Sequence, residues 1–444
     1  MWYIILYHLT ERSEFFILIF GVFTLGAIYF YWVVIKPLTK FEIIGLAILF
    51  RVVLLFGTPN FSDDFNRFIW DGKVSLSGGN PYELTPTQMI NKKVNFRVGN
   101  IEEIYSNLNS KNYYTVYPPV NQVIFAVSEF AGNGNVQSSV LYMKLFILLF
   151  EIGLIFLLFK MLRKLKLKES LAQIYALNPL VIIELTGNVH FEGIMLFFFM
   201  LGLWFLLTNK IILSGLAIAL AVNTKIVPLL FLPLFLPLLG LVKSVRLYAS
   251  IAVFSILMIL PFLSETLINN FGQSLELYFQ SFEFNASFYY LVKGISHYLL
   301  DYKTSLIGSF IPIAVFLFAI YLTYDLYRKN KTSNTSKFDL QLFISSAVPL
   351  MLVFYLLAST IHPWYIINLL VLCVFIPNKA IMFWSILIFL SYFAYSNYIE
   401  THFSGNFHDS NWYYFLTAVQ YILVLTVYFF DKKRERLAIG KSNL

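Results

Sequence analysis

The chain has 444 residues, of which 59% are hydrophobic and 13% charged, and its mean hydropathy is +0.72. This composition is far too apolar for a soluble globular domain, so it predicts an all-α polytopic membrane protein. The single cysteine, Cys373, lies within an apolar run, which excludes disulfide bonds and cysteine metal sites. In a soluble protein the net charge of +8 would suggest nucleic acid as a partner. Here much of the excess is a topology signal, and we expect no nucleic acid partner.

The sequence begins without the pattern of a removable signal peptide, so we expect the first apolar run to be retained as a membrane span. We predict about thirteen transmembrane helices in one integral-membrane domain, 1–444. The runs that predict them are 15–35, 43–57, 140–160, 171–187, 192–208, 211–224, 226–241, 246–263, 304–327, 341–358, 363–377, 380–398 and 412–430.

The basic residues predict the orientation, because Lys and Arg favour cytoplasmic links between helices. With the N-terminus outside, the basic links all fall on the cytoplasmic side, and the C-terminus lies inside. These links are 36–40, 160–168, 243–246, 328–337 and 432–436. The remaining links between helices would then lie outside the membrane.

Two long links fall on the predicted outer side, 58–138 (the first loop) and 264–303 (the second loop). Links of this length are usually functional or disordered. The first loop contains Trp, Tyr, Phe and Pro, a composition that favours a folded segment. Its apolar run 120–130 is short for a membrane span, so we predict an interfacial helix there. The second loop is rich in Phe and Tyr and is predicted to lie against lipid.

The segment 62–73 of the first loop combines three acidic and two basic residues with an apolar stretch. Helical spacing places Asp64, Arg67 and Asp71 on one face. The other face is apolar, which predicts a helix in the membrane interface. Its apolar residues are Phe65, Phe68, Ile69 and Trp70. An ordinary amphipathic connector is the alternative interpretation of this segment alone.

Three short links place further polar residues on the predicted outer side. They are 187–193, with Asn188, His190 and Glu192; 223–225, with Lys225; and 360–365, with His362, Trp364 and Tyr365. Each has a simpler interpretation, as an interfacial histidine, a lysine that reaches the headgroups or an aromatic belt. Four polar clusters on one side are nevertheless improbable by chance. We predict that they form one site, in which Lys225 and Arg67 are candidate anion binders.

Four charged residues lie inside apolar runs, where an unpaired charge is costly: Arg51, Lys144, Glu151 and Glu184. We predict that Arg51 and Glu151 form an ion pair between two helices. Glu184 lies within a turn of the link that carries His190, so we expect it to support the site.

These residue types suit the transfer of a group from a lipid phosphate. A carboxylate can accept the proton of an attacking hydroxyl, and Lys and Arg can hold a phosphate as it leaves. The sequence contains neither a metal-binding spacing nor a Gly-rich phosphate loop, so we expect no metal and no cofactor. The residues therefore indicate an outward-facing membrane enzyme that acts on an anionic lipid-linked substrate. The alternative function is a transporter or flippase of lipid-linked sugars, although the polar groups gather at one rim rather than at the membrane midplane.

Several stretches, taken in order, resemble the integral-membrane GT-C glycosyltransferases, in particular the bacterial polyprenyl-phosphate-mannose-dependent mannosyltransferases. They are 62–73 followed by Gly79-Asn80-Pro81-Tyr82, then Tyr117-Pro118-Pro119, Ala176-Leu177-Asn178-Pro179 leading to 187–192, Thr224-Lys225 with Pro228, and Pro363-Trp364-Tyr365. The resemblance covers most of 58–377. The chain departs from the commonest pattern at Asn66 and Phe68, where tyrosines are frequent, and at Phe191-Glu192, where Asn-Asp is frequent, which bears on the identity of the sugar.

The resemblance implies a GT-C-like fold and an inverting, metal-independent transfer of one hexose, most simply mannose. The donor would be a polyprenyl-phosphate sugar and the acceptor a hydroxyl of a glycan, lipid or protein. The site would face the periplasm or outside of a bacterial cytoplasmic (inner) membrane, and we expect a monomer surrounded by membrane lipids.

The resemblance also implies roles for individual residues. Asp64 would be the general base, with Asp63 as the near alternative. Lys225 would hold the donor phosphate, helped by Arg67 or His190. The remaining candidates would contact the sugar or the acceptor: Asp71, Asn188, Glu192, His362, Trp364, Tyr365 and Tyr117.

Overall fold

The computed structural model describes residues 1–96, 101–280, 282–300, 305–333 and 338–442. Within these ranges the chain is built from helices and contains no strand, only one isolated β-bridge between Phe284 and Thr360. The predicted all-α class is therefore confirmed.

Seven helical segments of the described chain are long and apolar enough to cross a membrane, so the polytopic class is also confirmed. They are Phe15–Ile35, Val136–Lys164, Leu241–Phe262, Ile311–Lys331, Leu340–Leu357, Lys379–Phe403 and Asn411–Asp431. An eighth span results if Pro179–Gly187 and Glu192–Leu207, which are bent by 112° at the link between them, are taken as one. The count of about thirteen stays a prediction.

The helices of the first half alternate between long spans and short pieces. In chain order they are α1 (Trp2–His8), α2 (Phe15–Phe30), η1 (Tyr31–Ile35), α3 (Lys40–Val53), α4 (Phe65–Leu76), α5 (Pro86–Asn91), α6 (Ile101–Ser106), α7 (Pro119–Gly132), α8 (Val136–Lys164), η2 (Glu169–Ala172), α9 (Gln173–Ala176), α10 (Pro179–Val181), η3 (Ile182–Gly187) and α11 (Glu192–Leu207).

The second half continues with α12 (Ile211–Val222), η4 (Val227–Phe231), α13 (Leu232–Leu239), α14 (Leu241–Ile259), η5 (Leu260–Phe262), α15 (Leu267–Gln280), α16 (Phe288–Leu300), α17 (Ser305–Ser333), α18 (Leu340–Leu357), η6 (Pro363–Ile366), α19 (Ile367–Cys373), α20 (Lys379–Leu387), η7 (Ile388–Tyr395), α21 (Asn397–Phe403), η8 (Phe407–Asp409) and α22 (Asn411–Ser442).

Local sequence signals explain where several helices begin. Thr39 and Glu42 form a capping box at the start of α3, and the side chain of Asn135 accepts a hydrogen bond at the start of α8. The predicted span 171–187 is instead broken into η2, α9, α10 and η3. Asn178 and Pro179 cause one of these breaks, because Asn178 caps a new helix whose first residue is Pro179.

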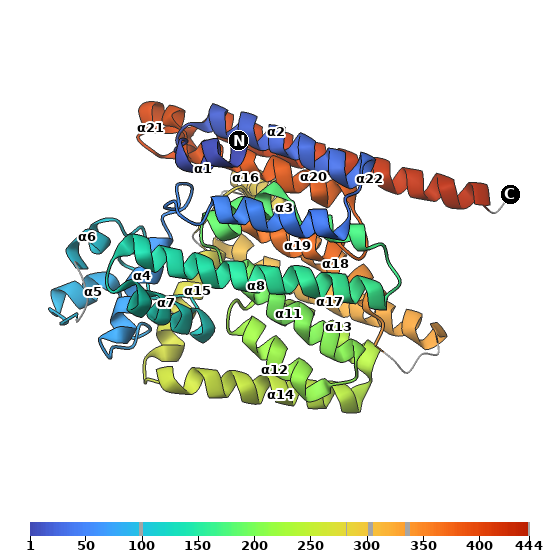
Figure 1. Ribbon diagram of the computed structural model, residues 1–444, viewed down its shortest axis with the longest axis horizontal. Helices are drawn as coiled ribbons and strands as arrows, with labels where there is room; N and C mark the ends of the chain where they lie inside the picture. Colours follow the sequence, from blue (N-terminus) through green and yellow to red (C-terminus); the bar gives the residue numbers. More distant parts are fainter. Residues whose placement is uncertain (97–100, 281, 301–304, 334–337, 443–444) are drawn as a thin grey trace.

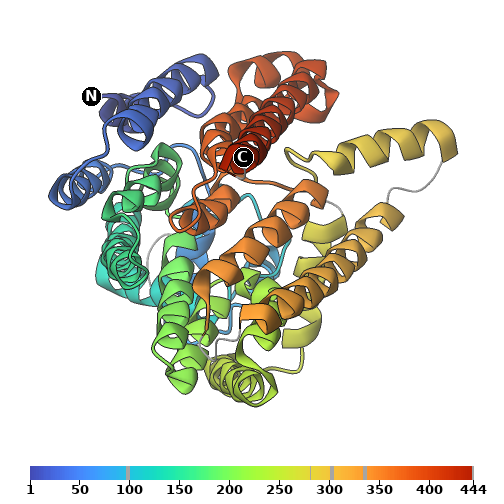
Figure 2. The same cartoon turned by 90° about the vertical axis from the view of Figure 1, so that its right-hand side faces the viewer.

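The helices lie side by side, and the first loop gathers at one end of the bundle. Figure 1 shows α4, α5, α6 and α7 at this end, whereas the C-terminus of α22 projects from the opposite end. Three of the predicted basic links, which follow η1, end α8 and begin α14, lie at the end near the C-terminus. Figure 2 shows the N-terminal helices beside the C-terminal ones, with α2 against α20 and η7. Part of the fourth predicted basic link, 334–337, lies outside the described residues.

The helix α4 differs from the prediction in where its apolar face lies. Phe68 and Trp70 are buried, and the ring of Phe68 stacks on Phe125 of α7 with a centroid distance of 4.7 Å. The backbone of α4 approaches α7 closely at Gly72, where an added Cβ would lie 2.7 Å from the carbonyl oxygen of Phe125. These aromatic residues therefore pack against protein rather than lipid. In α7, by contrast, Val123, Val127 and Phe130 form an exposed apolar stripe, as an interfacial helix requires.

The second loop contains α15 and α16 and is joined to the link before η6. Phe284 donates its N–H to the carbonyl oxygen of Ser359 (3.0 Å), and Ile361 donates to that of Phe284 (2.8 Å). Residues 281 and 301–303 of the predicted loop lie outside the described residues. Its contact with lipid stays a prediction, which agrees with the exposed apolar side chains of α16: Phe288, Leu291, Val292 and Ile295.

A buried ion pair joins α3 to α8, as predicted. Arg51 Nη2 lies 2.9 Å from Glu151 Oε1, and neither side chain is exposed. Arg51 also donates to the carbonyl oxygens of Ala47 and Ala176, and Thr186 donates to Glu151 Oε2. Both charges are thus paired and hydrogen-bonded, which makes their burial among apolar helices tolerable.

We predict that Arg51→Met destabilises the protein by roughly 3–5 kcal/mol, because it leaves the carboxylate of Glu151 buried without its cation. The double variant Arg51→Met/Glu151→Met should lose less than the sum of the two single losses. Thermal unfolding in detergent measures the effect. Glu169→Gln is the control, since its ion pair with Arg163 is exposed (59% and 32% for the two side chains) and should contribute at most ~1 kcal/mol. A smaller loss for Arg51→Met than for Glu169→Gln would contradict the prediction.

Candidate functional site

The four predicted polar clusters meet at one cavity of about 510 Å³ at the α4 end of the bundle. Its wall includes parts of the first loop, the links before α11, η4 and η6, the second loop and η7. Of the predicted residues, ten line it: Asp63, Asp64, Arg67, Tyr117, His190, Glu192, Lys225, His362, Trp364 and Tyr365. The described wall is largely aromatic around a few charged groups, as is common in binding sites for organic ligands.

Asp64 stands immediately before α4 and directs its carboxylate towards the link that precedes α11. Its Oδ2 lies 3.9 Å from Nε2 of His190, and its Oδ1 accepts a hydrogen bond from Nδ2 of Asn109 (3.1 Å). The side chain is 26% exposed, so the carboxylate remains accessible from the cavity.

Asp63 has a different set of partners. Its Oδ2 lies 3.5 Å from Nη2 of Arg12, and its Oδ1 accepts a second hydrogen bond from Asn109 (3.1 Å). The guanidinium of Arg12 lies 4.7 Å from the ring centroid of Tyr395. Asp63 is thus held by a cation at the rim, whereas Asp64 faces the histidine.

His190 is held between two carboxylates. Its Nδ1 lies 3.1 Å from Glu184 Oε2, on the side opposite to Asp64. Glu184 is fully buried and also accepts hydrogen bonds from the hydroxyl of Tyr392 (2.7 Å) and the amide of Asn188 (3.0 Å). Glu184, which is fixed by two donors, therefore lies against the imidazole where the sequence predicted that it would be near His190.

These contacts determine the charge states at neutral pH. Burial by itself would lower the pKa of His190, but its interactions with the carboxylates of Asp64, Glu184 and Glu192 raise it to about 9. For Asp64, burial would raise the pKa, but the nearby His190 and the hydrogen bond from Asn109 outweigh burial and lower the pKa. Burial lowers the pKa of His362 to about 3. The site thus contains an imidazolium beside an ionised carboxylate, and a neutral second histidine.

Four rings form a column along one wall of the cavity. His190 stacks on Trp364 with a centroid distance of 3.7 Å, and Trp364 stacks on His362 at 4.4 Å with nearly parallel planes. His362 in turn stacks on Phe284 of the second loop at 4.9 Å. An imidazolium on the face of an indole is favourable, so the column also favours the charged form of His190.

Lys225 and Glu192 form an ion pair on the cavity wall. The ammonium contacts Oε1 of Glu192, which is buried, while the lysine side chain is 21% exposed. A lysine ammonium has three donors, so Lys225 can keep this partner and still bind an anion that enters the cavity.

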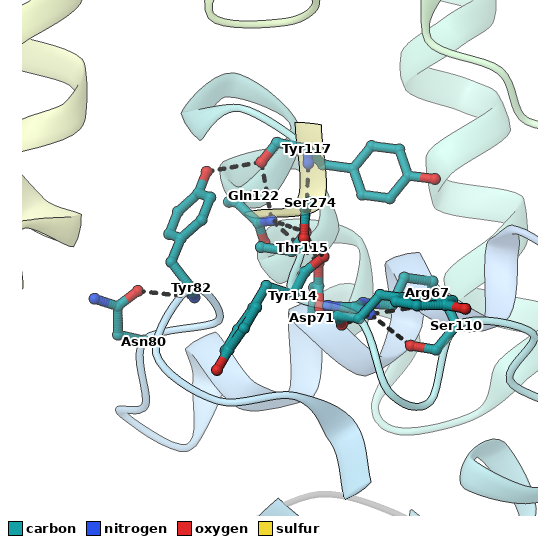
Figure 3. Close-up of polar contacts among 11 residues, drawn as sticks. Arg67, Asp71, Asn80, Tyr82, Ser110, Tyr114, Thr115, Tyr117, Gln122 and Ser274 are labelled. Atoms are coloured by element: carbon teal, nitrogen blue, oxygen red, sulfur yellow. Dashed lines mark hydrogen bonds and ion pairs between the residues drawn. The ribbon is translucent and has the colours of Figure 1, made fainter. Parts of the chain in front are cut away.

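Arg67 and Asp71 join the segment 110–115 to α4 (Figure 3). Arg67 Nε donates to Asp71 Oδ1 (2.9 Å), and its Nη1 donates to the carbonyl oxygens of Ser110 (3.2 Å) and Tyr113 (2.8 Å). Asp71 Oδ2 accepts from the hydroxyl of Thr115 (2.6 Å). Arg67 therefore lines the cavity with much of its guanidinium already engaged by the protein.

The same network reaches the neighbouring helices. Gln122 of α7 donates to Asp71 (3.1 Å) and to the carbonyl oxygen of Tyr117 (3.1 Å), which also accepts the hydroxyl hydrogen bond of Tyr82 (2.7 Å). Ser274 of α15 donates to the carbonyl oxygen of Tyr114 (2.9 Å). Figure 3 shows these side chains converging on the segment 110–117. These bonds hold the segment where it lines the cavity.

Two predicted residues lie behind the cavity wall rather than on it. Asp71 is 1% exposed and forms an ion pair with Arg67, one helical turn earlier in α4. Asn188 is fully buried and donates to Glu184. Sequence reasoning missed Arg12, Asn109 and Asn368, all of which line the cavity. Arg12 could have been recognised as a candidate site residue, because basic residues are few on the predicted outer side. Nothing in the sequence singled out Asn109 and Asn368.

The described residues contain no group of three or more His, Cys, Asp or Glu side chains placed to hold a metal ion. The positive charge at the cavity comes from His190, Lys225, Arg67 and Arg12.

Comparison with known sequences gives one match. Residues 3–241, more than half of the chain, match a protein family described as alpha-(1->6)-mannopyranosyltransferase, N-terminal domain. Neither the curated proteins nor the solved structures contain a match to the chain. The matched segment includes Asp64, His190, Glu192 and Lys225 and ends before the second loop and the ring column's Trp364.

We predict that one histidine of the folded protein titrates near pH 9 and that His190→Gln removes this titration. The pKa of His190 is raised above its ordinary value of 6.5, so its stabilising contribution is complete below about 6.5 and is lost as the pH rises through about 9. The measurement is an NMR titration of protein labelled at its six histidines. His402→Gln, at an exposed position, is the control that should leave the resonance in place. If every histidine titrated below about pH 7, the ion-paired state of His190 would be wrong.

Proposed function

The chain belongs to the alpha-(1->6)-mannopyranosyltransferase family, and from this premise we propose that it transfers one mannose from a polyprenyl-phosphate donor to an acceptor hydroxyl. One observation carries the proposal. An ionised carboxylate, Asp64, and a partly exposed lysine, Lys225, come from distant links and line the same cavity. A base and a phosphate-binding cation are what displacement of a lipid phosphate by a hydroxyl requires.

In the proposed reaction the acceptor hydroxyl gives its proton to the Asp64 carboxylate as its oxygen attacks the anomeric carbon. The new carbon–oxygen bond forms on the face opposite to the phosphate, and the bond from the anomeric carbon to the phosphate oxygen breaks with its electron pair. The anomeric configuration is therefore inverted. The imidazolium of His190 keeps Asp64 ionised before attack, and Glu184 keeps the imidazole directed at Asp64.

Lys225 has the proposed role of holding the phosphate. Negative charge grows on the phosphate as it leaves, and an ammonium in a site with little water stabilises it most effectively. The pair with Glu192 orients the lysine before the donor arrives. Arg67 and Arg12 supply further positive charge at the wall, although both already contact acidic side chains.

We also propose the setting of the reaction. The basic links at the opposite end of the bundle favour a cytoplasmic position for that end, so the cavity would open outside the cytoplasmic membrane of a bacterium. The lipid donor would reach the cavity from the surrounding membrane, and the acceptor would be a hydroxyl of a glycan, lipid or protein. No metal is needed in this scheme, because protein side chains supply the positive charge.

The test is a transfer assay on the purified full-length chain, with a panel of polyprenyl monophosphate sugars and nucleotide sugars as donors, with and without a chelator. We expect product from polyprenyl-phosphate-mannose with or without chelator. Product only from nucleotide sugars would overturn the proposed donor, and loss of product with the chelator would overturn metal independence.

We predict that Asp64→Asn lowers the rate of mannose transfer by about 10²–10⁴-fold without loss of folding, because the amide cannot accept the hydroxyl proton. Asp63→Asn is the matched control, since Asp63 pairs with Arg12 at the rim and should lose far less activity. Initial rates at saturating donor measure the effect, with thermal unfolding as the check of folding. Equal losses in the two variants, or none in either, would show that Asp64 is not the base.

We predict that Lys225→Gln raises the KM for the polyprenyl-phosphate donor by about 10- to 100-fold, since a charge-assisted hydrogen bond to the phosphate is lost. The KM for the acceptor should change little. The control is Lys210→Gln, in the exposed link between α11 and α12, which should leave both values unchanged. A donor KM equal to that of the wild type would rule out the phosphate role.

A further inference from the structure

Two side chains on the cavity wall hold a hydrogen-bond acceptor that has no partner among the described residues. They are Glu192, with Oε2, and Asn368, with Oδ1; both oxygens are buried, and the residues are 1% and 3% exposed. A buried acceptor without a partner is costly, so it calls for an explanation. Both belong to the cavity, and a ligand in the cavity is the natural source of the missing donors.

The neighbours of Asn368 decide which end of its amide lacks a partner. The hydroxyl of Tyr355 donates to the carbonyl oxygen of Tyr365 (2.9 Å), so this hydroxyl must accept rather than donate towards Asn368. It accepts from Nδ2 of Asn368 (2.9 Å). The amide nitrogen is thereby fixed against Tyr355, and the oxygen Oδ1 is left as the group available to a ligand.

Glu192 is oriented in a similar way. Its Oε1 is held by the ammonium of Lys225, which leaves Oε2 without a donor. Glu192 is the first residue of α11, and Asn368 belongs to α19, which packs against α11. Trp364 precedes Asn368 by four residues, about one helical turn, and contributes an aromatic face to the same wall.

We propose that Glu192 and Asn368 form the subsite that binds the hydroxyl groups of the transferred sugar and so determine which sugar is accepted. This inference rests on the proposed function. Two acceptors require a ligand that brings O–H donors, which sugars have in abundance and an ionised phosphate lacks. Lys225 contacts Glu192 and also binds the donor phosphate in the proposed reaction. The anomeric carbon, which carries the phosphate, therefore lies beside Glu192. The hydroxyl on the carbon next to the anomeric centre lies nearest, and Asn368 receives a hydroxyl farther along the ring.

Such a subsite distinguishes one sugar from another by the hydrogen bonds that the sugar hydroxyls form with Glu192 and Asn368. A donor that lacks the matching hydroxyl leaves the oxygen of Asn368 buried without a partner, which a site built for a hydroxyl rejects strongly. The surrounding rings of Trp364 and Tyr365 contact the apolar faces of a sugar ring but cannot replace the missing hydrogen bond.

The experiment measures the binding of polyprenyl-phosphate-mannose and of four analogues, each lacking one of the four free hydroxyls of the mannose, to the full-length protein. Affinity is read from the rise in unfolding temperature with ligand, so the readout does not need turnover. We expect the wild type to bind at least one analogue about 10- to 100-fold more weakly than the complete donor. In Asn368→Leu the complete donor should weaken by a similar factor, while one of these analogues binds as well as the complete donor.

The matched control is Asn330→Leu. Asn330 likewise has its amide nitrogen bonded, to the carbonyl oxygen of Pro237 (2.9 Å), and its oxygen without a partner in the described part of the chain, but it is not part of the cavity wall. It should keep the wild-type pattern. If wild type and Asn368→Leu showed the same penalties for all four analogues, or if the wild type penalised none, the subsite would be wrong. Even if Asn368→Leu fails to fold, a wild type that penalises no analogue would overturn the subsite. Failure of the proposed function is seen separately, as binding without any transfer product.

Discussion

A single buried histidine between two carboxylates determines the character of the cavity. Asp64 and Glu184 come from segments that are far apart in the sequence, and in a poorly solvated site their charges would repel each other. The imidazolium of His190 lies between them and compensates both. Asp64, whose pKa burial alone would raise, therefore stays ionised and can accept a proton. The neutral His362 and the ion-paired Lys225 complete an arrangement in which each charge has a neighbour of opposite sign.

The geometry around His190 depends on how α4 is seated. Asp64 precedes α4, so its direction follows from the packing of that helix against α7 and from the bonds of Arg67 and Asp71 to the segment 110–115. On the other side, Glu184 lies in η3, a short irregular segment between two breaks of the chain. The irregular backbone there is tolerable because Tyr392 and Asn188 satisfy the carboxylate and because protein, rather than lipid, surrounds it.

Much of this arrangement could be predicted from the sequence, and the exceptions have physical reasons. An unpaired charge inside an apolar run is costly, and this cost predicted the ion pair of Arg51 and Glu151. Amphipathic spacing predicted the helix α4 but placed its aromatic face in lipid, because an apolar face shows only that it avoids water. Whether Asp63 or Asp64 faces the histidine depends on Arg12, some fifty residues away, and on side-chain directions that spacing does not contain. Asn368 lies in an apolar run, where a buried asparagine looks the same whether it serves packing or a ligand.

The column of rings from His190 to Phe284 has a mechanical consequence. Its far end belongs to the second loop, which is held to the link before η6 by two backbone hydrogen bonds, and its near end is the histidine that faces Asp64. Because the four rings stack in sequence, the position of the imidazole depends on side chains of two separate segments, the second loop and the link before η6. The second loop therefore shares one wall of the cavity with the histidine that neighbours Asp64.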